Sequence, residues 1–125
     1  MIWIKETYCS FEVAKLLKEK GFDSRCWAGY TSYGQFFTSM IQDYNKDNLW
    51  GCIAPTHQIA MKWLREIYGI DIVIEISDPS VNDRKYYCVI WDKNNDSHIL
   101  ELFDSYEDAV EAALKYCLEN IKRKI

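Results

Sequence analysis

Two histidines and five cysteines are the side chains of this 125-residue chain that could act as nucleophiles, bases or zinc ligands. Cys52 precedes His57 by five residues, and a thiol beside an imidazole is the pair that cysteine nucleophiles use. Such a nucleophile also needs a third group that orients the base, and no such group is evident next to this pair. We therefore predict no catalytic residue and expect His57 to be an exposed histidine at a helix start. We expect His98 to be partly buried in a strand, on the face that carries Leu100.

A zinc site would need Cys26, Cys52, His57 and a fourth ligand. Their spacing matches none of the paired Cys and His knuckles that zinc-binding domains use. The cysteines are odd in number, widely spaced and without a CxxC pair, so we expect reduced thiols, several of them buried. We predict no metal and no cofactor. The chain also contains no phosphate-loop, dinucleotide, zinc-protease or nucleophile-elbow motif, which favours a protein that is not an enzyme.

The carboxylates fall into two groups that ordinary structural roles explain. Asp71 and Glu75 alternate with apolar residues and should share the solvated face of one strand. Asp104, Glu107 and Asp108 lie at a predicted helix start, where negative charge favours the positive end of the helix dipole.

An aromatic tract within residues 23–53 is the candidate binding region. Exposed aromatic rings near Arg25 and Lys46 would suit stacking on bases or anchoring a protein interface. The alternative is a second small core that packs against the helices. The candidate binding residues in this tract are Trp27, Tyr30, Tyr33, Tyr44 and Trp50.

The element that positions the rest of the chain is an amphipathic helix over 55–68 that runs through Gly69 into a strand over 70–77. Gly69 suits a helix end because only glycine enters the left-handed conformation without steric cost. The strand alternates isoleucine with other residues, so one of its faces should belong to the core. The helix has an apolar stripe that should be buried, formed by Ile59, Ala60, Trp63, Leu64 and Ile67.

The remaining periodicities predict an α+β fold. Strands over 70–77, 84–92 and 97–103 should form an antiparallel three-stranded meander, packed by the helices 55–68 and 106–122. The strand 84–92 is apolar on both sides, so we expect both of its faces to be covered. A further helix over 10–20 and an aromatic hairpin over 26–40, with strands 26–31 and 35–40, complete the prediction of one domain spanning 1–125.

Charge and composition limit the function classes. The net charge of −4 argues against broad non-specific nucleic-acid binding, which depends on Lys and Arg that neutralise phosphates. The start MIWIKETYCS has neither a basic region nor a long apolar run, so it does not read as a secretory signal, and no stretch approaches the length of a membrane span. We predict a cytoplasmic protein without a membrane partner.

Three segments carry a resemblance to known proteins: FEVAKLLKEKGFD at 11–23, APTHQIAMKWLREIYGIDIVI at 54–74 and FDSYEDAVEAALKYCLENI at 103–121. Together they resemble a group of small uncharacterised proteins from gut Bacteroidales and their phages or prophages. The resemblance implies an accessory protein of a mobile element and assigns no residue a role.

The element order of residues 55–122 also resembles double-stranded RNA-binding domains and, at its end, antitoxin-like domains of HicB type. RNA-binding domains of this kind resemble one another in a basic cluster at the start of the second helix. Here that place holds Asp104, Glu107 and Asp108.

We therefore predict a non-enzymatic binding or accessory protein of a phage or mobile element that acts through protein-protein contact, with a host protein as partner. The alternative is binding of a nucleotide or of single-stranded nucleic acid by aromatic stacking. The oligomeric state is left open.

Overall fold

The computed structural model describes residues 4–42, 51–77 and 84–121 of an α+β protein with two antiparallel three-stranded sheets. The first sheet has the order β2-β1-β3 and the second the order β4-β5-β6. In chain order the elements are α1 (Phe11–Glu19), β1 (Cys26–Tyr30), β2 (Phe36–Gln42), β3 (Cys52–Ile53), α2 (His57–Trp63), the π-helix η2 (Leu64–Tyr68), β4 (Asp71–Ile76), β5 (Tyr86–Trp91), β6 (Ser97–Phe103) and α3 (Tyr106–Asn120).

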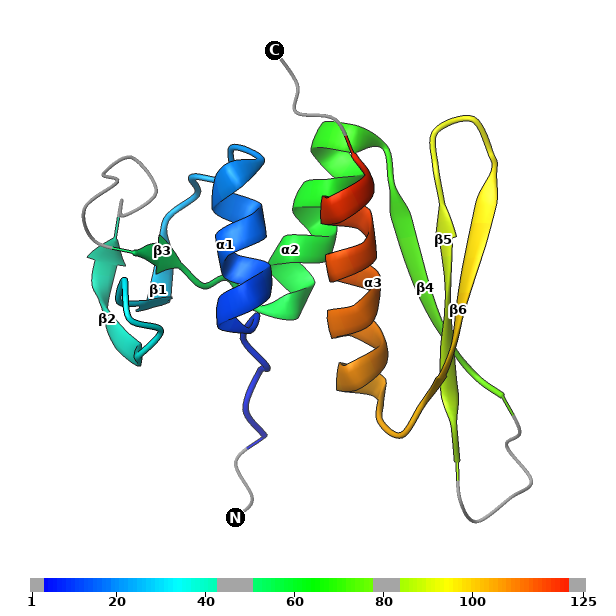
Figure 1. Ribbon diagram of the computed structural model, residues 1–125, viewed down its shortest axis with the longest axis horizontal. Coiled ribbons are helices and arrows are strands. Elements are labelled where there is room, and N and C mark those ends of the chain that lie inside the picture. The colour runs from blue at the N-terminus through cyan, green and yellow to red at the C-terminus, as the bar shows by residue number, and fades with distance from the viewer. Residues whose placement is uncertain (1–3, 43–50, 78–83, 122–125) are drawn as a thin grey trace.

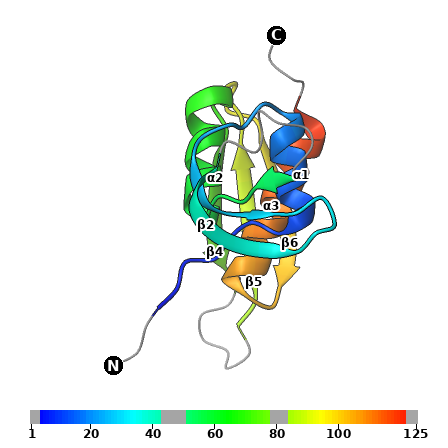
Figure 2. The same cartoon turned by 90° about the vertical axis from the view of Figure 1, so that its left-hand side faces the viewer.

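The helices form a layer between the two sheets (Figure 1). The sheet β2-β1-β3, which we call the small sheet because its strand β3 has only two residues, lies on the side of α1. The sheet β4-β5-β6, which we call the large sheet, lies on the side of α3. Figure 2, seen from the small sheet, shows the helices behind it and the large sheet behind the helices. The largest buried cluster draws on α1, α2, α3 and β5, with residues such as Leu17, Leu64, Cys88 and Leu114. The three helices therefore bring the main core together.

The predicted starts of α1 and α3 agree with the structure to within one residue, and α3 ends at Asn120 rather than at residue 122. The Ser10 hydroxyl accepts a hydrogen bond from the Val13 N–H, and the Ser105 hydroxyl accepts one from the Asp108 N–H, so each serine caps its helix. After α1, the N–H of Phe22 donates to the Leu17 carbonyl at 2.9 Å, and the Phe22 ring is buried. These caps fix where each helix meets the rest of the chain.

The helix predicted over 55–68 is present, but its buried face differs from the predicted stripe. It begins as α2 and widens into η2 for its last turn, which shifts the phase of the side chains that follow Leu64. Ile59 and Ile67 are exposed, whereas Ala60, Met61 and Leu64 are buried. Gly69 ends the helix in the left-handed conformation, with φ of 67°, as predicted.

The predicted hairpin is also confirmed, with β1 and β2 antiparallel. β3 adds a third strand on the other side of β1, through the pairs Gly29 with Ile53 and Tyr30 with Cys52. A Cβ atom on Gly29 would lie 2.9 Å from the Cys52 carbonyl oxygen, so glycine permits this close approach.

The meander is confirmed, but the expectation that both faces of its central strand are covered is wrong. β4, β5 and β6 pair in antiparallel order, and α3 contacts all three strands from one side. The helices lie on that side (Figure 1), and no helix of the described residues covers the other face. Of the isoleucine row on the inner face of β4, Ile72 and Ile74 are half-buried and Ile76 is exposed.

Candidate functional site

The structure divides the predicted aromatic residues rather than gathering them. The side chain of Trp27 is 62% exposed and that of Tyr33 is 96% exposed. Tyr30 is half-buried, and its hydroxyl donates to the Cys9 carbonyl at 2.8 Å. Tyr44 and Trp50 lie outside the described residues. The Tyr30 ring also contacts Phe11 and Phe36, so this part of the tract is packed while Trp27 and Tyr33 face solvent.

Trp27 lies in a groove of about 490 Å³ between the small sheet and α2. Ile59 and Trp63 contribute apolar surface from the helix, and Arg25 and Lys62 contribute positive charge. Glu6 and Glu66 also line the groove, and Glu66 pairs with Lys62, so the groove combines an exposed indole ring with two cations and two carboxylates. This combination is suited to stacking interactions with a planar ligand.

The open face of the large sheet is a second candidate surface, and sequence reasoning missed it. Strand register places Val73, Val89 and Ile99 side by side across the three strands on this face. Tyr87 and Trp91 flank Val89 along β5. Val73, Trp91 and Ile99 are exposed, with Ile99 reaching 54%. These five residues are the apolar centre of what we call the open sheet face.

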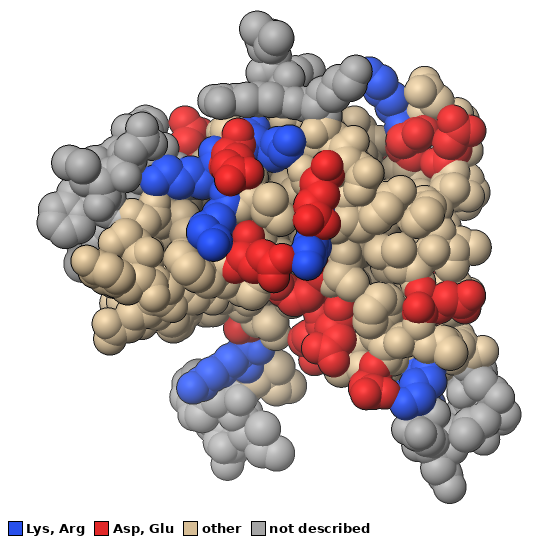
Figure 3. Space-filling model, in the orientation of Figure 1, with Lys and Arg blue, Asp and Glu red and all other residues tan. Residues whose placement is uncertain are grey.

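The rim of the open sheet face is acidic. Asp71 pairs with Trp91, and Glu75 and Glu101 pair with Tyr87 from opposite sides, so these carboxylates share the face with the apolar centre. Ser97 occupies the remaining corner opposite Trp91. None of these positions is Lys or Arg. Figure 3 shows the helix layer, where acidic and basic side chains gather together over α1 and α3.

One signal for this face was present in the sequence. β5 is apolar on both sides, and only one side can face the helices. Periodicity alone does not show whether the chain has an element left to cover the second side, so the open face emerged only from the structure.

A buried polar cluster is the third feature, and it corrects the prediction for His57. The His57 side chain is 5% exposed, because it starts α2 beneath the segment that leads into α1. Its Nε2 atom lies 2.5 Å from Oε2 of Glu111 in α3. The Ser10 N–H also donates to the Glu111 carboxylate, at 3.2 Å to Oε2. Three segments of the chain therefore meet at Glu111.

The carboxylate of Glu111 is held in its charged form. Burial disfavours the charge, but hydrogen bonds from His57 and Ser10 outweigh this effect and hold the pKa of Glu111 below its ordinary value. Within the described residues, no buried side-chain nitrogen or oxygen lacks a hydrogen-bond partner. His57 and Glu111 thus form a satisfied polar pair between α2 and α3.

The thiol that joins His57 is that of Cys9, whereas Cys52 packs in a separate cluster with Ala14, Ala28 and Ala54. The side chain of Cys9 is 0% exposed. Burial raises the pKa of the Cys9 thiol well above its ordinary value, and the charge of Glu111 raises it further. This arrangement is opposite to that of a reactive cysteine, which is accessible and has a lowered pKa.

His98 lies on the predicted side of its strand but is exposed rather than partly buried. β6 is an edge strand, so one face of the imidazole stays open. The other face stacks on the Tyr116 ring, with ring centroids 4.3 Å apart. All five cysteines are buried and free, as predicted for reduced thiols.

Comparisons of the chain with family models, curated proteins and solved structures gave no match. Within the part of the chain that the structure describes, no helix combines the length and apolarity that crossing a membrane requires.

Proposed function

We propose that this chain is a non-enzymatic accessory protein of a phage or mobile element that acts by binding another protein through the open sheet face. The resemblance of its three sequence segments supports the mobile-element origin. The contact surface is supported by a single observation: an apolar centre of five side chains on a sheet face that no described helix covers. Exposed contiguous apolar surface rimmed by polar residues is typical of protein interaction sites.

The chemistry of the partner follows from the charges on the rim. Asp71, Glu75 and Glu101 surround the apolar centre, and none of the paired positions on this face of the three strands is Lys or Arg. A partner that places apolar side chains on Val89 and Ile99, and Lys or Arg at its own rim, would be complementary. A second copy of this chain would bring carboxylates against carboxylates, which disfavours self-association through this face. The proposed partner is therefore a different protein, with a basic rim.

Site-specific photo-crosslinking in the native host tests this proposal. A photoreactive amino acid at Ile99 should give one covalent adduct with a different protein, joined at a segment rich in Lys or Arg. The same amino acid at Gln58, which is exposed on α2, should not give that adduct. With a Glu75→Lys/Glu101→Lys variant, the yield should fall about tenfold or more because the rim charge is reversed. An adduct between two copies of this chain, or the same adduct from Gln58, would contradict the proposal.

The groove beside Trp27 favours a second candidate function, binding of a nucleotide or single-stranded nucleic acid by stacking. The exposed indole with Arg25 and Lys62 is the specific observation that supports it. The discriminating measurement is binding of a labelled single-stranded oligonucleotide at low salt by native protein, a Trp27→Ala variant and a Trp91→Ala variant. Loss with Trp27→Ala alone would favour this function, and no binding by any of the three would exclude it.

A further inference from the structure

The buried polar cluster contains three kinds of zinc ligand. One ligand atom each from Cys9, His57 and Glu111 lies within 4.8 Å of the other two. Thiolate, imidazole and carboxylate are the donor groups that Zn²⁺ uses in proteins. In the described part of the chain no other three His, Cys, Asp or Glu side chains come together in this way.

The distances in the cluster suit a tetrahedral ion. Zinc bonds of about 2.0 Å to nitrogen and oxygen and about 2.3 Å to sulfur place neighbouring ligand atoms about 3.3–3.5 Å apart. The three donor atoms lie within 4.8 Å of one another, and His57 Nε2 and Glu111 Oε2 are 2.5 Å apart, so the distances that zinc requires fall between these two values. The contact of 2.5 Å between His57 Nε2 and Glu111 Oε2 would open by about 1 Å, and the ion would replace the hydrogen bond that joins them.

The backbone around the ligands is fixed in advance. The Cys9 N–H donates to the Pro55 carbonyl at 2.9 Å, and the His57 N–H donates to the Thr7 carbonyl at 2.8 Å. These bonds tie the strand-like segment before α1 to the start of α2. The Ser10 N–H lies within hydrogen-bond distance of both oxygens of Glu111, so it can orient the carboxylate while one oxygen binds an ion. Such outer hydrogen bonds orient metal ligands in known sites.

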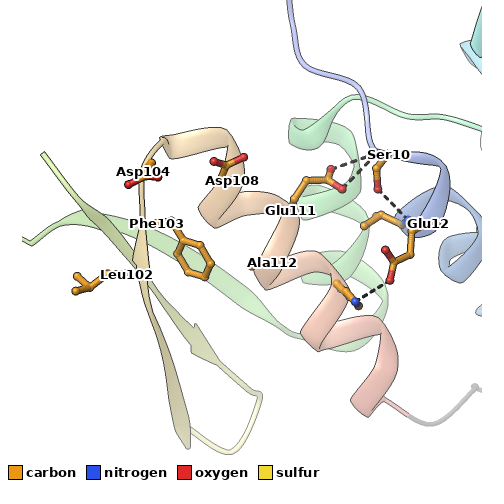
Figure 4. Close-up of a pocket in the computed structure, with 10 residues that line it drawn as sticks. Ser10, Glu12, Leu102, Phe103, Asp104, Asp108, Glu111 and Ala112 are labelled. Atoms are coloured by element: carbon orange, nitrogen blue, oxygen red, sulfur yellow. Dashed lines mark hydrogen bonds and ion pairs between the residues drawn. The ribbon is translucent and has the colours of Figure 1, made fainter. Parts of the chain in front are cut away.

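The cluster reaches the surface at its Glu111 end. The Glu111 side chain is 28% exposed and lines a hollow of about 410 Å³. Figure 4 shows this hollow, with Glu111 pointing from α3 toward Ser10 and with Asp104 and Asp108 at the far end. The hollow is therefore open to solvent and acidic, which favours the approach of a cation. His57 also lines a separate hollow of about 200 Å³ beside Thr7 and Gln58.

We propose that Cys9, His57 and Glu111 bind a zinc ion that joins the segment before α1 to α2 and α3. Each ligand comes from a different segment, so one ion would connect all three in the folded chain. Cys9 would bind as a thiolate, and its proton would be released to solvent as the ion enters. Three protein ligands leave the fourth position to water.

Cobalt substitution tests the site directly in the full chain. Protein freed of metal by a chelator is titrated with Co²⁺, which gives a thiolate-to-cobalt absorption band when a cysteine sulfur is bound. We expect one Co²⁺ per chain with this band, displacement by one Zn²⁺, and a higher melting temperature with Zn²⁺ than with chelator. Wild-type protein that shows no thiolate band at saturating Co²⁺ would overturn the proposal, whatever the variants do.

Matched variants then identify the ligands. Cys9→Ala should abolish the thiolate band, and His57→Gln and Glu111→Gln should each weaken Zn²⁺ affinity at least tenfold. Cys117→Ala is the control, because Cys117 is a buried thiol of α3 outside the cluster. Circular dichroism confirms that each variant is folded. An unchanged thiolate band in folded Cys9→Ala protein would show that another cysteine binds the ion and would contradict the assignment.

Discussion

At the scale of single residues, Glu111 connects parts of the chain that are far apart in sequence. It accepts from the Ser10 N–H, 101 residues away, and contacts His57 at the start of α2. Burial would normally neutralise a carboxyl group, and here hydrogen bonds keep it charged. The pair is thus a polar link inside an otherwise apolar junction of helices, and its loss would leave a buried imidazole without its partner.

Replacing Glu111 with Ala should lower the free energy of unfolding by about 1–3 kcal/mol in the presence of a chelator, because a buried imidazole and the Ser10 N–H lose their acceptor. Solvent reaches part of Glu111, which keeps the loss below that of a fully buried ion pair. Glu111→Gln, which retains an acceptor oxygen, should lose less. Urea unfolding measures all three proteins.

Lys62→Ala is the control for this prediction. Lys62 and Glu66 form an exposed pair across one helical turn, 3.9 Å apart, so its loss should change the free energy of unfolding by less than about 0.5 kcal/mol. If Glu111→Ala and Lys62→Ala had the same effect, the proposed role of the buried pair would be wrong.

At the scale of elements, two glycines separate two costs of adding a side chain: the strain of a left-handed backbone and a steric clash of the added Cβ atom. Gly21, after α1, and Gly51, before β3, have φ angles of 96° and 103°. A Cβ atom on Gly21 would meet nothing within 4 Å, whereas one on Gly51 would lie 2.1 Å from the Tyr30 carbonyl oxygen. An alanine at either position would therefore be conformationally strained, but only an alanine at position 51 would also clash with the backbone of β1.

Gly21→Ala should reduce the free energy of unfolding by about 1–2 kcal/mol, the cost of a left-handed conformation for a residue with a side chain. Gly51→Ala should reduce it by more than about 3 kcal/mol, because the small sheet has to move apart as well. Thermal unfolding of the two variants beside wild type provides the comparison. Equal losses would show that the contact between Gly51 and β1 does not limit this turn.

Local periodicity was sufficient to predict the helices, the meander and the hairpin, since each helix, strand and turn in them is encoded by neighbouring residues. The widened turn η2 has no such signal, and it changes the phase of Ile67. Ile59 precedes this turn and is exposed because Ala60 and Met61 are the residues of α2 that face the core. His57 was misjudged because its environment depends on Glu111, far along the chain. The candidate sites were harder to predict than the fold, since both the open sheet face and the Cys9 cluster depend on which distant elements meet.

At the scale of the whole molecule, all five cysteines are buried and none forms a disulfide. Burial raises the pKa of Cys117 from 9.0 to about 12 and that of Cys52 from 9.0 to about 11. The unfolded chain releases these protons from about pH 9, while the folded chain keeps them to higher pH. Between these values the unfolded state binds fewer protons, so the free energy of unfolding must fall as pH rises.

We therefore expect stability under reducing conditions to decline from about pH 9 toward pH 12, and the decline to be shallower in Cys117→Ala than in wild type. Urea unfolding at pH 8, 9.5 and 10.5 measures both slopes. Parallel slopes for the two proteins would mean that Cys117 does not contribute to the alkaline loss of stability.

The acidic rim of the open sheet face has a consequence for how the large sheet finds its pairing. β5 is apolar on both sides, so shifting it by one residue would exchange one apolar set for another and cost little burial. β4 is different, because the same shift would turn Asp71 and Glu75 toward the helices. The carboxylates that would select a partner thus also select the strand alignment. A mutation that replaces these carboxylates with apolar residues would therefore weaken both the choice of partner and the choice of strand alignment.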